Sequence, residues 1–266
     1  LMDYSKMKSQ HKIPSRKLAQ AIGQSSVLLL MATASLTLAS SASAETAPTS
    51  TQISFKTLTY RDYQGDEDRI DIDALALQVD IPIAGQWSVS ASAVTDAISG
   101  ASPKYHSSAL TPIEDDRKAY SLSGTRYFPQ ASVTLGTSYS KERDYVSHSY
   151  SLQNTLSTQN QNTTLITGIG YTSDKILPNS IFLNNNEEKR VLDVALGLTQ
   201  VFSQSDIAQA TYRHARGRGY YADQYKLYDA RPDSRDSDSF LLRWNHHFSG
   251  NDSTLRSSYR YYQDSF

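Results

Sequence analysis

The chain has 266 residues, a formal net charge of -1, 38% hydrophobic residues, 18 Tyr and no Cys, with a mean hydropathy of -0.51. The absence of Cys excludes disulfide scaffolds, thiol nucleophiles and zinc–thiolate modules. After the first residues there is no apolar run of the roughly 20 residues that a membrane-spanning helix needs. The near-zero net charge argues against a non-specific nucleic-acid binder, so we expect no nucleic acid among the partners.

The first 44 residues have the pattern of a secretory signal peptide. Basic residues precede an apolar segment at 25–39, and the small residues Ala42-Ser43-Ala44 follow it. We therefore predict cleavage between Ala44 and Glu45, a short flexible lead-in at 45–51, and one exported domain at 52–266.

The exported part alternates with a period of two residues. From Leu192 to Leu198, every second side chain is apolar, and small or polar residues lie between them; 240–248 repeats the pattern. This period is typical of β-strands with one apolar and one polar face. We predict eleven strands, near 52–63, 70–82, 86–97, 119–129, 131–142, 147–158, 163–173, 190–202, 206–217, 238–248 and 253–263.

The connections between these strands differ in length at the two ends. Short ones are predicted at 83–85, 130, 159–162, 203–205 and 249–252, long ones at 98–118, 174–189 and 218–237, and intermediate ones at 64–69 and 143–146. Outer-membrane barrels have tight periplasmic turns and longer external loops. The sequence therefore predicts an all-β, antiparallel, up-and-down transmembrane β-barrel of about 11–12 strands. A soluble sandwich, whose apolar faces would meet in a core, is the other fold that this period allows.

Four aromatic residues of the apolar parity flank the short turns: Trp87, Phe128, Phe202 and Phe248. In a barrel they would form a periplasmic aromatic girdle at the level of the lipid headgroups. In a sandwich they would be core residues beside hairpins. Three polar residues of the same parity, Arg126, Gln200 and His246, do not fit an apolar face.

The polar parity of the last strands carries four basic residues, Arg213, Arg243, Arg256 and Arg260. On adjacent strands they would form a basic stripe in the lumen, which would favour anionic solutes. The competing interpretation is an ion-pair network with residues such as Asp193, because buried arginines need partners.

Other polar groups point to no catalytic, metal or cofactor site. Acidic runs at 66–68 and 114–116 are expected in external loops, but their spacing matches no calcium-binding loop. His246 and His247 are adjacent, so they point to opposite faces of a strand and cannot share one zinc ion. A G-x-S-x-G motif and the nucleotide-binding glycine fingerprints are absent from the sequence.

Several segments together resemble a known bacterial family: 100–106, 125–128, 223–226 with 231–232, 242–248 and 258–262. They are similar to the outer-membrane family catalogued as domain of unknown function 3570, from about Ile53 to the end of the chain. The resemblance implies a Gram-negative outer-membrane barrel without an established activity, and it supplies no catalytic residues. Some members are encoded beside periplasmic flavin-transfer and thioredoxin-like proteins, which the resemblance therefore suggests as partners.

The resemblance also predicts an incomplete barrel. Family members continue beyond the position of Tyr262, and eleven is an odd number, whereas bacterial single-chain barrels close with even numbers. The terminal Phe266 would be typical of an outer-membrane protein, but Asp264 interrupts the apolar alternation before it. We therefore expect a C-terminally truncated chain whose sheet is open at its seam.

The sequence as a whole predicts an exported outer-membrane barrel that is a pore, a transporter or a structural barrel, and not an enzyme. Its partners would be outer-membrane lipid, lipopolysaccharide and the barrel-assembly machinery. Two alternatives remain: a barrel enzyme that hydrolyses lipid or peptide at the cell surface, and a soluble secreted β-protein that binds carbohydrate or protein.

Overall fold

A computed structural model describes residues 46–64, 67–100, 113–177, 185–222 and 229–266. The chain divides into two units, 1–41 and 42–266, and the second contains every residue discussed below. The predicted signal peptide and the cleavage site at Ala44 and Glu45 lie outside the described residues. In the described part of the chain, no helix is long and apolar enough to cross a membrane.

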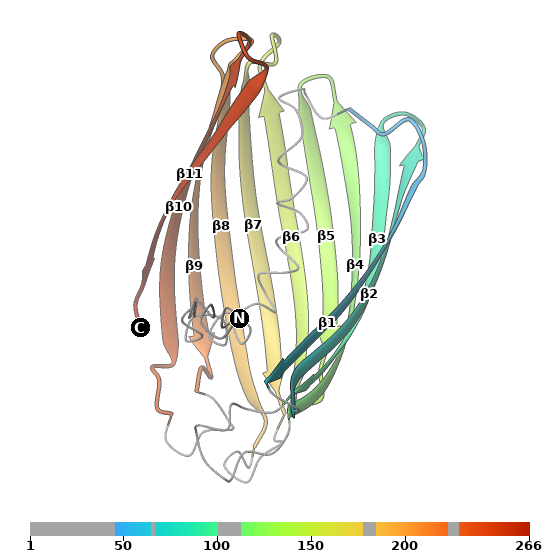
Figure 1. Cartoon of the computed structure of the whole chain (residues 1–266), viewed down its shortest axis with the longest axis vertical. Helices are drawn as coiled ribbons and strands as arrows, with labels where there is room; N and C mark the ends of the chain where they lie inside the picture. The colour runs from blue at the N-terminus through green and yellow to red at the C-terminus, as the bar shows by residue number, and fades with distance from the viewer. Residues whose placement is uncertain (1–45, 65–66, 101–112, 178–184, 223–228) are drawn as a thin grey trace, which may run out of the picture. The chain divides into compact units, whose positions relative to one another are not determined.

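The described residues form one antiparallel sheet in which each strand pairs with the next along the chain (Figure 1). Its eleven strands are β1 Gln52–Gln64, β2 Glu67–Ile83, β3 Trp87–Gly100, β4 Ile113–Phe128, β5 Ala131–Lys141, β6 Tyr145–Ser157, β7 Thr163–Ile176, β8 Glu187–Val201, β9 Asp206–Gly219, β10 Ser234–Phe248 and β11 Ser253–Asp264. The prediction of an all-β, up-and-down sheet is confirmed, and every predicted strand overlaps an observed one.

The sheet is strongly curved and remains open. Its edge strands β1 and β11 lie at opposite margins, and neither pairs with the other (Figure 1). The short connections gather at one end of the sheet, the upper end in Figure 1, and the longer ones leave the other end. The expectation of an open sheet is therefore confirmed.

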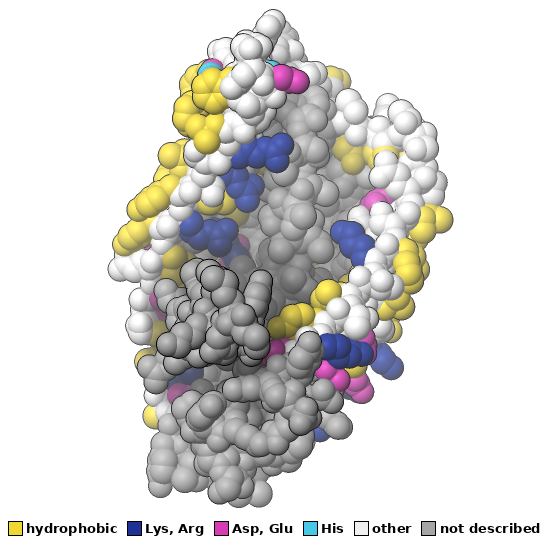
Figure 2. All heavy atoms as spheres, in the orientation of Figure 1, with side chains coloured by type: hydrophobic (Ala, Val, Ile, Leu, Met, Phe, Trp, Pro, Cys, Tyr) yellow, Lys and Arg dark blue, Asp and Glu magenta, His cyan; other side chains and the backbone are white. Residues whose placement is uncertain are grey.

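Residues that pair across strands share one face, so the register sorts all side chains into two surfaces. Leu135, Leu152, Ile169 and Val194 form one such row from β5 to β8, and they are 63%, 42%, 47% and 45% exposed. The neighbouring row on the other face begins with Gly136 and Ser151. The apolar surface is called the outer face below, and the polar surface is called the inner face. Figure 2 shows hydrophobic side chains along the outer margins of the curved sheet.

Several strands extend further toward the long-loop end than predicted. β4 begins at Ile113 and β2 at Glu67, so 67–68 and 114–116 lie in strands and not in loops, while Asp66 is outside the described residues. A ladder uses backbone groups alone, so pairing continues through charged residues where the apolar alternation has already ended. The connections 65–66 and 142–144 are consequently as short as the turns of the other end, and the predicted alternation of lengths holds only in part.

The β2–β3 turn has a defined backbone conformation. Ala84 and Gly85 have φ angles of 51° and 67°, and the Gln86 N–H donates to the Ile83 carbonyl at 3.3 Å. Two consecutive positive φ angles are the signature of a type I′ turn, whose twist matches that of the strands it joins.

Gly219, the last residue of β9, provides a test of how the long-loop end is held. Its φ is +122°, and a Cβ there would lie 2.1 Å from the Glu188 carbonyl oxygen. We expect Gly219→Ala to lower the stability by about 1–3 kcal/mol, because the strained backbone cannot relax against another strand. The measurement is the temperature at which the folded band of the detergent-solubilised protein is lost on a gel. Gly124→Ala is the control, since a Cβ there meets nothing within 4 Å; equal midpoints for the two variants would contradict the prediction.

Candidate functional site

The register places all four predicted basic residues on the inner face of β9, β10 and β11. Arg213 is opposite Ser239, which is opposite Tyr262, and Arg243 is opposite Ser258. Arg256 and Arg260 flank Ser258 on the same side of β11. Lys and Arg side chains are visible along the inner side of the wall that carries these last strands (Figure 2).

Arg213 belongs to an ion pair. Its guanidinium donates to the carboxylate of Asp193 on β8, and the Asp193 side chain is only 10% exposed. Arg213 lies opposite Ala195, so Asp193 is its diagonal neighbour on the adjacent strand. The ion-pair interpretation therefore holds for this one member of the stripe.

The other three residues form a different arrangement, which we call the arginine triad: Arg243, Arg256 and Arg260. Arg243 lies opposite Ser258, midway between Arg256 and Arg260, so it is the diagonal neighbour of both. Diagonal neighbours in a sheet are about 7–8 Å apart. The Arg243 guanidinium approaches the amide oxygen of Gln209 at 3.5 Å. Within the described residues, no member of the triad forms an ion pair with a carboxylate. The triad is thus a local excess of positive charge on the inner face.

Elsewhere on the inner face, three basic side chains have acidic partners. The pairs are Arg117 with Asp96 at 2.7 Å, Lys189 with Asp174 at 3.2 Å, and Arg235 with Asp264 at 2.9 Å through Nε. They all lie nearer the long-loop end than the triad does. Asp264, which interrupts the apolar alternation near the C-terminus, is accounted for by its pairing with Arg235.

Lys189 also has aromatic neighbours. Its ammonium is 5.1 Å from the centre of the Tyr145 ring and 5.7 Å from that of Tyr221, while the Asp174 side chain is fully buried beside it. Tyr221 follows β9, and burial raises the pKa of its phenol. A Cβ at Gly217 would lie 1.7 Å from the Tyr221 hydroxyl, so the glycine makes room for this ring. The cluster joins β6, β7 and β8 to the segment after β9.

The four predicted girdle residues lie at the short-turn end of the outer face. Trp87, Phe128 and Phe248 are terminal residues of their strands, Phe202 directly follows β8, and they are 46%, 47%, 45% and 69% exposed. Their placement fits a row of aromatics at one level. Their contact with lipid headgroups stays a prediction.

The three polar residues that did not fit the apolar face have local partners. The Arg126 guanidinium lies over the rings of Trp87 and Phe128, 4.9 and 5.5 Å from their centres. His246 Nδ1 is 2.8 Å from an Asp206 carboxylate oxygen that also accepts the Trp244 indole N–H at 3.1 Å. The Gln200 amide oxygen accepts the Thr163 hydroxyl at 2.7 Å. His247 lies on the opposite, inner face, as predicted, and its Nδ1 is 3.2 Å from the Thr254 hydroxyl oxygen.

The outer face also carries a second aromatic row, which the sequence alone did not reveal. It is formed by tyrosines at the margin toward the long loops: Tyr120, Tyr139, Tyr150, Tyr171, Tyr212 and Tyr261. In each of these strands the next outer-face residue toward the long loops is polar or charged, and in β4 and β5 it is a lysine. The available signal was a tyrosine of the apolar parity two residues from a polar residue of the same parity.

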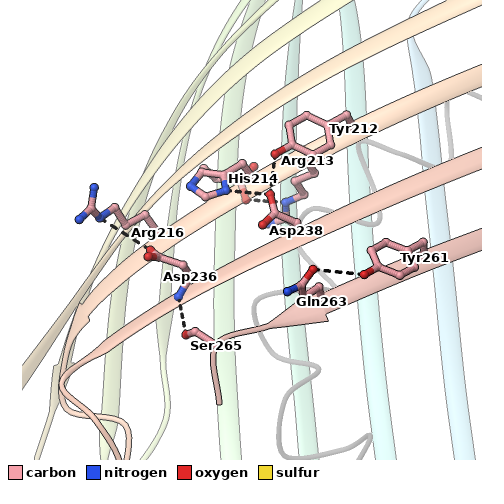
Figure 3. Close-up of polar contacts among 10 residues, drawn as sticks. Tyr212, Arg213, His214, Arg216, Asp236, Asp238, Tyr261, Gln263 and Ser265 are labelled. Atoms are coloured by element: carbon pink, nitrogen blue, oxygen red, sulfur yellow. Dashed lines mark hydrogen bonds and ion pairs between the residues drawn. The ribbon is translucent and has the colours of Figure 1, made fainter.

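Beyond the tyrosine row, the outer face carries its own polar contacts (Figure 3). The Tyr212 hydroxyl donates to Asp238 Oδ1 at 2.5 Å, and His214 Nδ1 lies 2.9 Å from the same oxygen. One outer-face position further toward the long loops, Arg216 Nε lies 3.7 Å from Asp236 Oδ1. The outer face therefore changes from apolar to polar or charged within about two residues of each tyrosine.

The ion pair of Arg117 and Asp96 provides a stability test. Both side chains are largely buried, at 10% and 14% exposed, so Arg117→Met would leave an unpaired carboxylate and cost about 3 kcal/mol. Arg190→Met is the control, since its pair with Glu188 is 62% and 61% exposed and is worth about 0–1 kcal/mol. Urea unfolding in detergent micelles measures both variants; similar losses would show that the buried pair has no special role.

Solved structures similar to this chain are outer-membrane proteins. A mutant of the ferric enterobactin receptor (PfeA) of Pseudomonas aeruginosa matches with a TM-score of 0.50 at 9% identity, covering 83% of this chain and 40% of the receptor. The siderophore receptor PirA of the same organism matches with a TM-score of 0.48 at 10% identity, with the same coverage. OmpT of Vibrio cholerae matches with a TM-score of 0.42 at 15% identity, covering 73% of this chain and 57% of OmpT.

These likenesses concern the fold alone. The chain spans about two fifths of the length of either receptor, 40% in both alignments. No match was found among curated proteins. The fold is that of outer-membrane β-barrel proteins, in the form of an open, eleven-stranded sheet over the described residues.

A family model covers nearly the whole chain in three overlapping stretches, residues 20–112, 105–183 and 179–266. These stretches include the segments that carry the resemblance and all eleven strands. The chain belongs to the family described as protein of unknown function (DUF3570).

Proposed function

We propose that the protein is a β-barrel of a Gram-negative outer membrane, exported by the N-terminal signal peptide and inserted by the barrel-assembly machinery, and that it passes anionic solutes. The arginine triad is the observation that carries the anionic preference. A charged cluster in a confined lumen biases permeation toward ions of opposite charge. Ion pairs such as Arg117 with Asp96 have no net charge, so a lumen that contained only such pairs would not favour anions.

The outer face supports a location in lipid. Large apolar side chains such as Leu135 and Tyr150 are 63% and 58% exposed there. Only Ala119 and Ile176 are buried hydrophobic residues within the described part of the chain. A soluble sandwich needs a second layer against this face, whereas a barrel needs only lipid.

The proposal requires the free edges of β1 and β11 to be paired in the membrane. Unpaired backbone N–H and C=O groups are too costly in hydrocarbon, so open edges do not occur there. Further strands between β11 and β1 would satisfy both edges.

Ion selectivity tests the role of the triad. In planar bilayers with a KCl gradient, we expect the full-length protein to prefer chloride, and Arg243→Gln/Arg256→Gln/Arg260→Gln to lower the chloride-to-potassium permeability ratio severalfold. The matched control removes three outer-face charges, Arg190→Gln/Arg216→Gln/Arg218→Gln, and should leave the ratio unchanged. Cation preference of the wild type, or an unaltered ratio in the triad variant, would overturn the proposal.

Cell fractionation tests the location independently. We expect the full-length protein in the outer-membrane fraction, with a folded band that shifts on heating. Recovery in the periplasm or the medium without such a shift would favour the soluble alternative.

A further inference from the structure

Three exposed lysines lie in one register row on the outer face. Lys118 of β4 is directly opposite Lys141 of β5; Lys141 is opposite Val146 of β6, which is opposite Lys175 of β7. Neighbouring strands are about 4.8 Å apart, so the row spans about 15 Å. We call these three residues the lysine row.

The row is not neutralised by the described residues. Like charges directly opposite one another destabilise a sheet, and Lys118 and Lys141 are such a pair. None of the three lysines forms an ion pair within the part of the chain that the structure describes. Two acidic residues are near, but Asp116 lies one outer-face position beyond Lys118, and Glu188, opposite Lys175, binds Arg190 at 2.9 Å.

The position of the row relative to the tyrosines indicates what covers it. Tyr120 and Tyr139 are directly opposite one another, one outer-face position nearer the apolar band than Lys118 and Lys141. Tyr171 lies two such positions from Lys175. Tyrosine rings favour the boundary between hydrocarbon and headgroups, and lysine side chains reach outward from it to the headgroups.

We propose that the lysine row is a binding site for the phosphate groups of outer-leaflet lipid A, an inference that rests on the proposed outer-membrane location. Lysine ammonium groups make charge-assisted hydrogen bonds to phosphate oxygens. A row about 15 Å long accommodates more than one phosphate. The bound anion also relieves the repulsion between Lys118 and Lys141.

The test is a titration of the full-length protein in detergent with fluorescent lipid A, either bisphosphorylated or stripped of both phosphates. The wild type should bind the bisphosphorylated form more tightly. Lys118→Gln/Lys141→Gln/Lys175→Gln should weaken that binding by on the order of 100-fold and leave the phosphate-free form unaffected. The corresponding triple Lys→Arg variant should retain binding, and Lys56→Gln, which removes a charge from the inner face of β1, should have no effect.

Two results would overturn the lysine row: wild-type binding that does not depend on the phosphates, or a triple Gln variant that binds as tightly as the wild type. Insertion into phosphatidylcholine vesicles, read from the heat-dependent gel shift, reports separately on the barrel. A protein that inserts but shows no phosphate dependence refutes the row alone. A protein that fails to insert refutes the proposed location and the row with it.

Discussion

The antiparallel register is the constraint on which both surfaces of this protein depend. Ile169 pairs with Val194 on the outer face, and the neighbouring pair, Gly170 with Asp193, lies on the inner face. A shift of β8 by one residue would exchange these faces, placing Asp193 outward and Val194 inward. Because a shift would place a charge on the apolar outer face and remove the partner of Arg213, β8 has one favourable register.

This arrangement gives stability without a conventional core. The ladder satisfies the backbone groups of β2 to β10, which have a neighbouring strand on both sides. The large apolar side chains remain exposed on the outer face. The inner face is held toward the long-loop end by ion pairs and by the aromatic neighbours of Lys189. The arginine triad lies outside this paired region, so its charge is not balanced by a carboxylate of the described residues.

The sequence predicted the strands well because alternation of apolar and polar residues follows directly from the geometry of a two-faced strand. It did not predict the charged ends of β2 and β4, where pairing persists without alternation. It could not separate Arg213 from the triad, because Asp193 is 20 residues away and becomes a neighbour only through the β8–β9 register. The tyrosine row was equally hidden, since its members lie at different depths along their strands and form a line only when the strands are placed side by side.

That line runs obliquely across the register rows. Tyr120 and Tyr139 share a row that continues to Arg218 on β9. The tyrosine of β9, however, is Tyr212, which lies six residues nearer the short-turn end than Arg218. Six residues correspond to about 20 Å along β9. Tyr261 of β11 shares the row of Tyr212 through Phe240. The offset therefore spreads over the seven strand spacings from β4 to β11, about 34 Å, and the line is inclined by about 30° to the rows. Strands of a transmembrane barrel tilt by about 35–45° from the membrane normal. The edge of the apolar surface is therefore not level along any row of paired residues, and an edge oblique to the rows is also what tilted strands crossing a flat membrane would show.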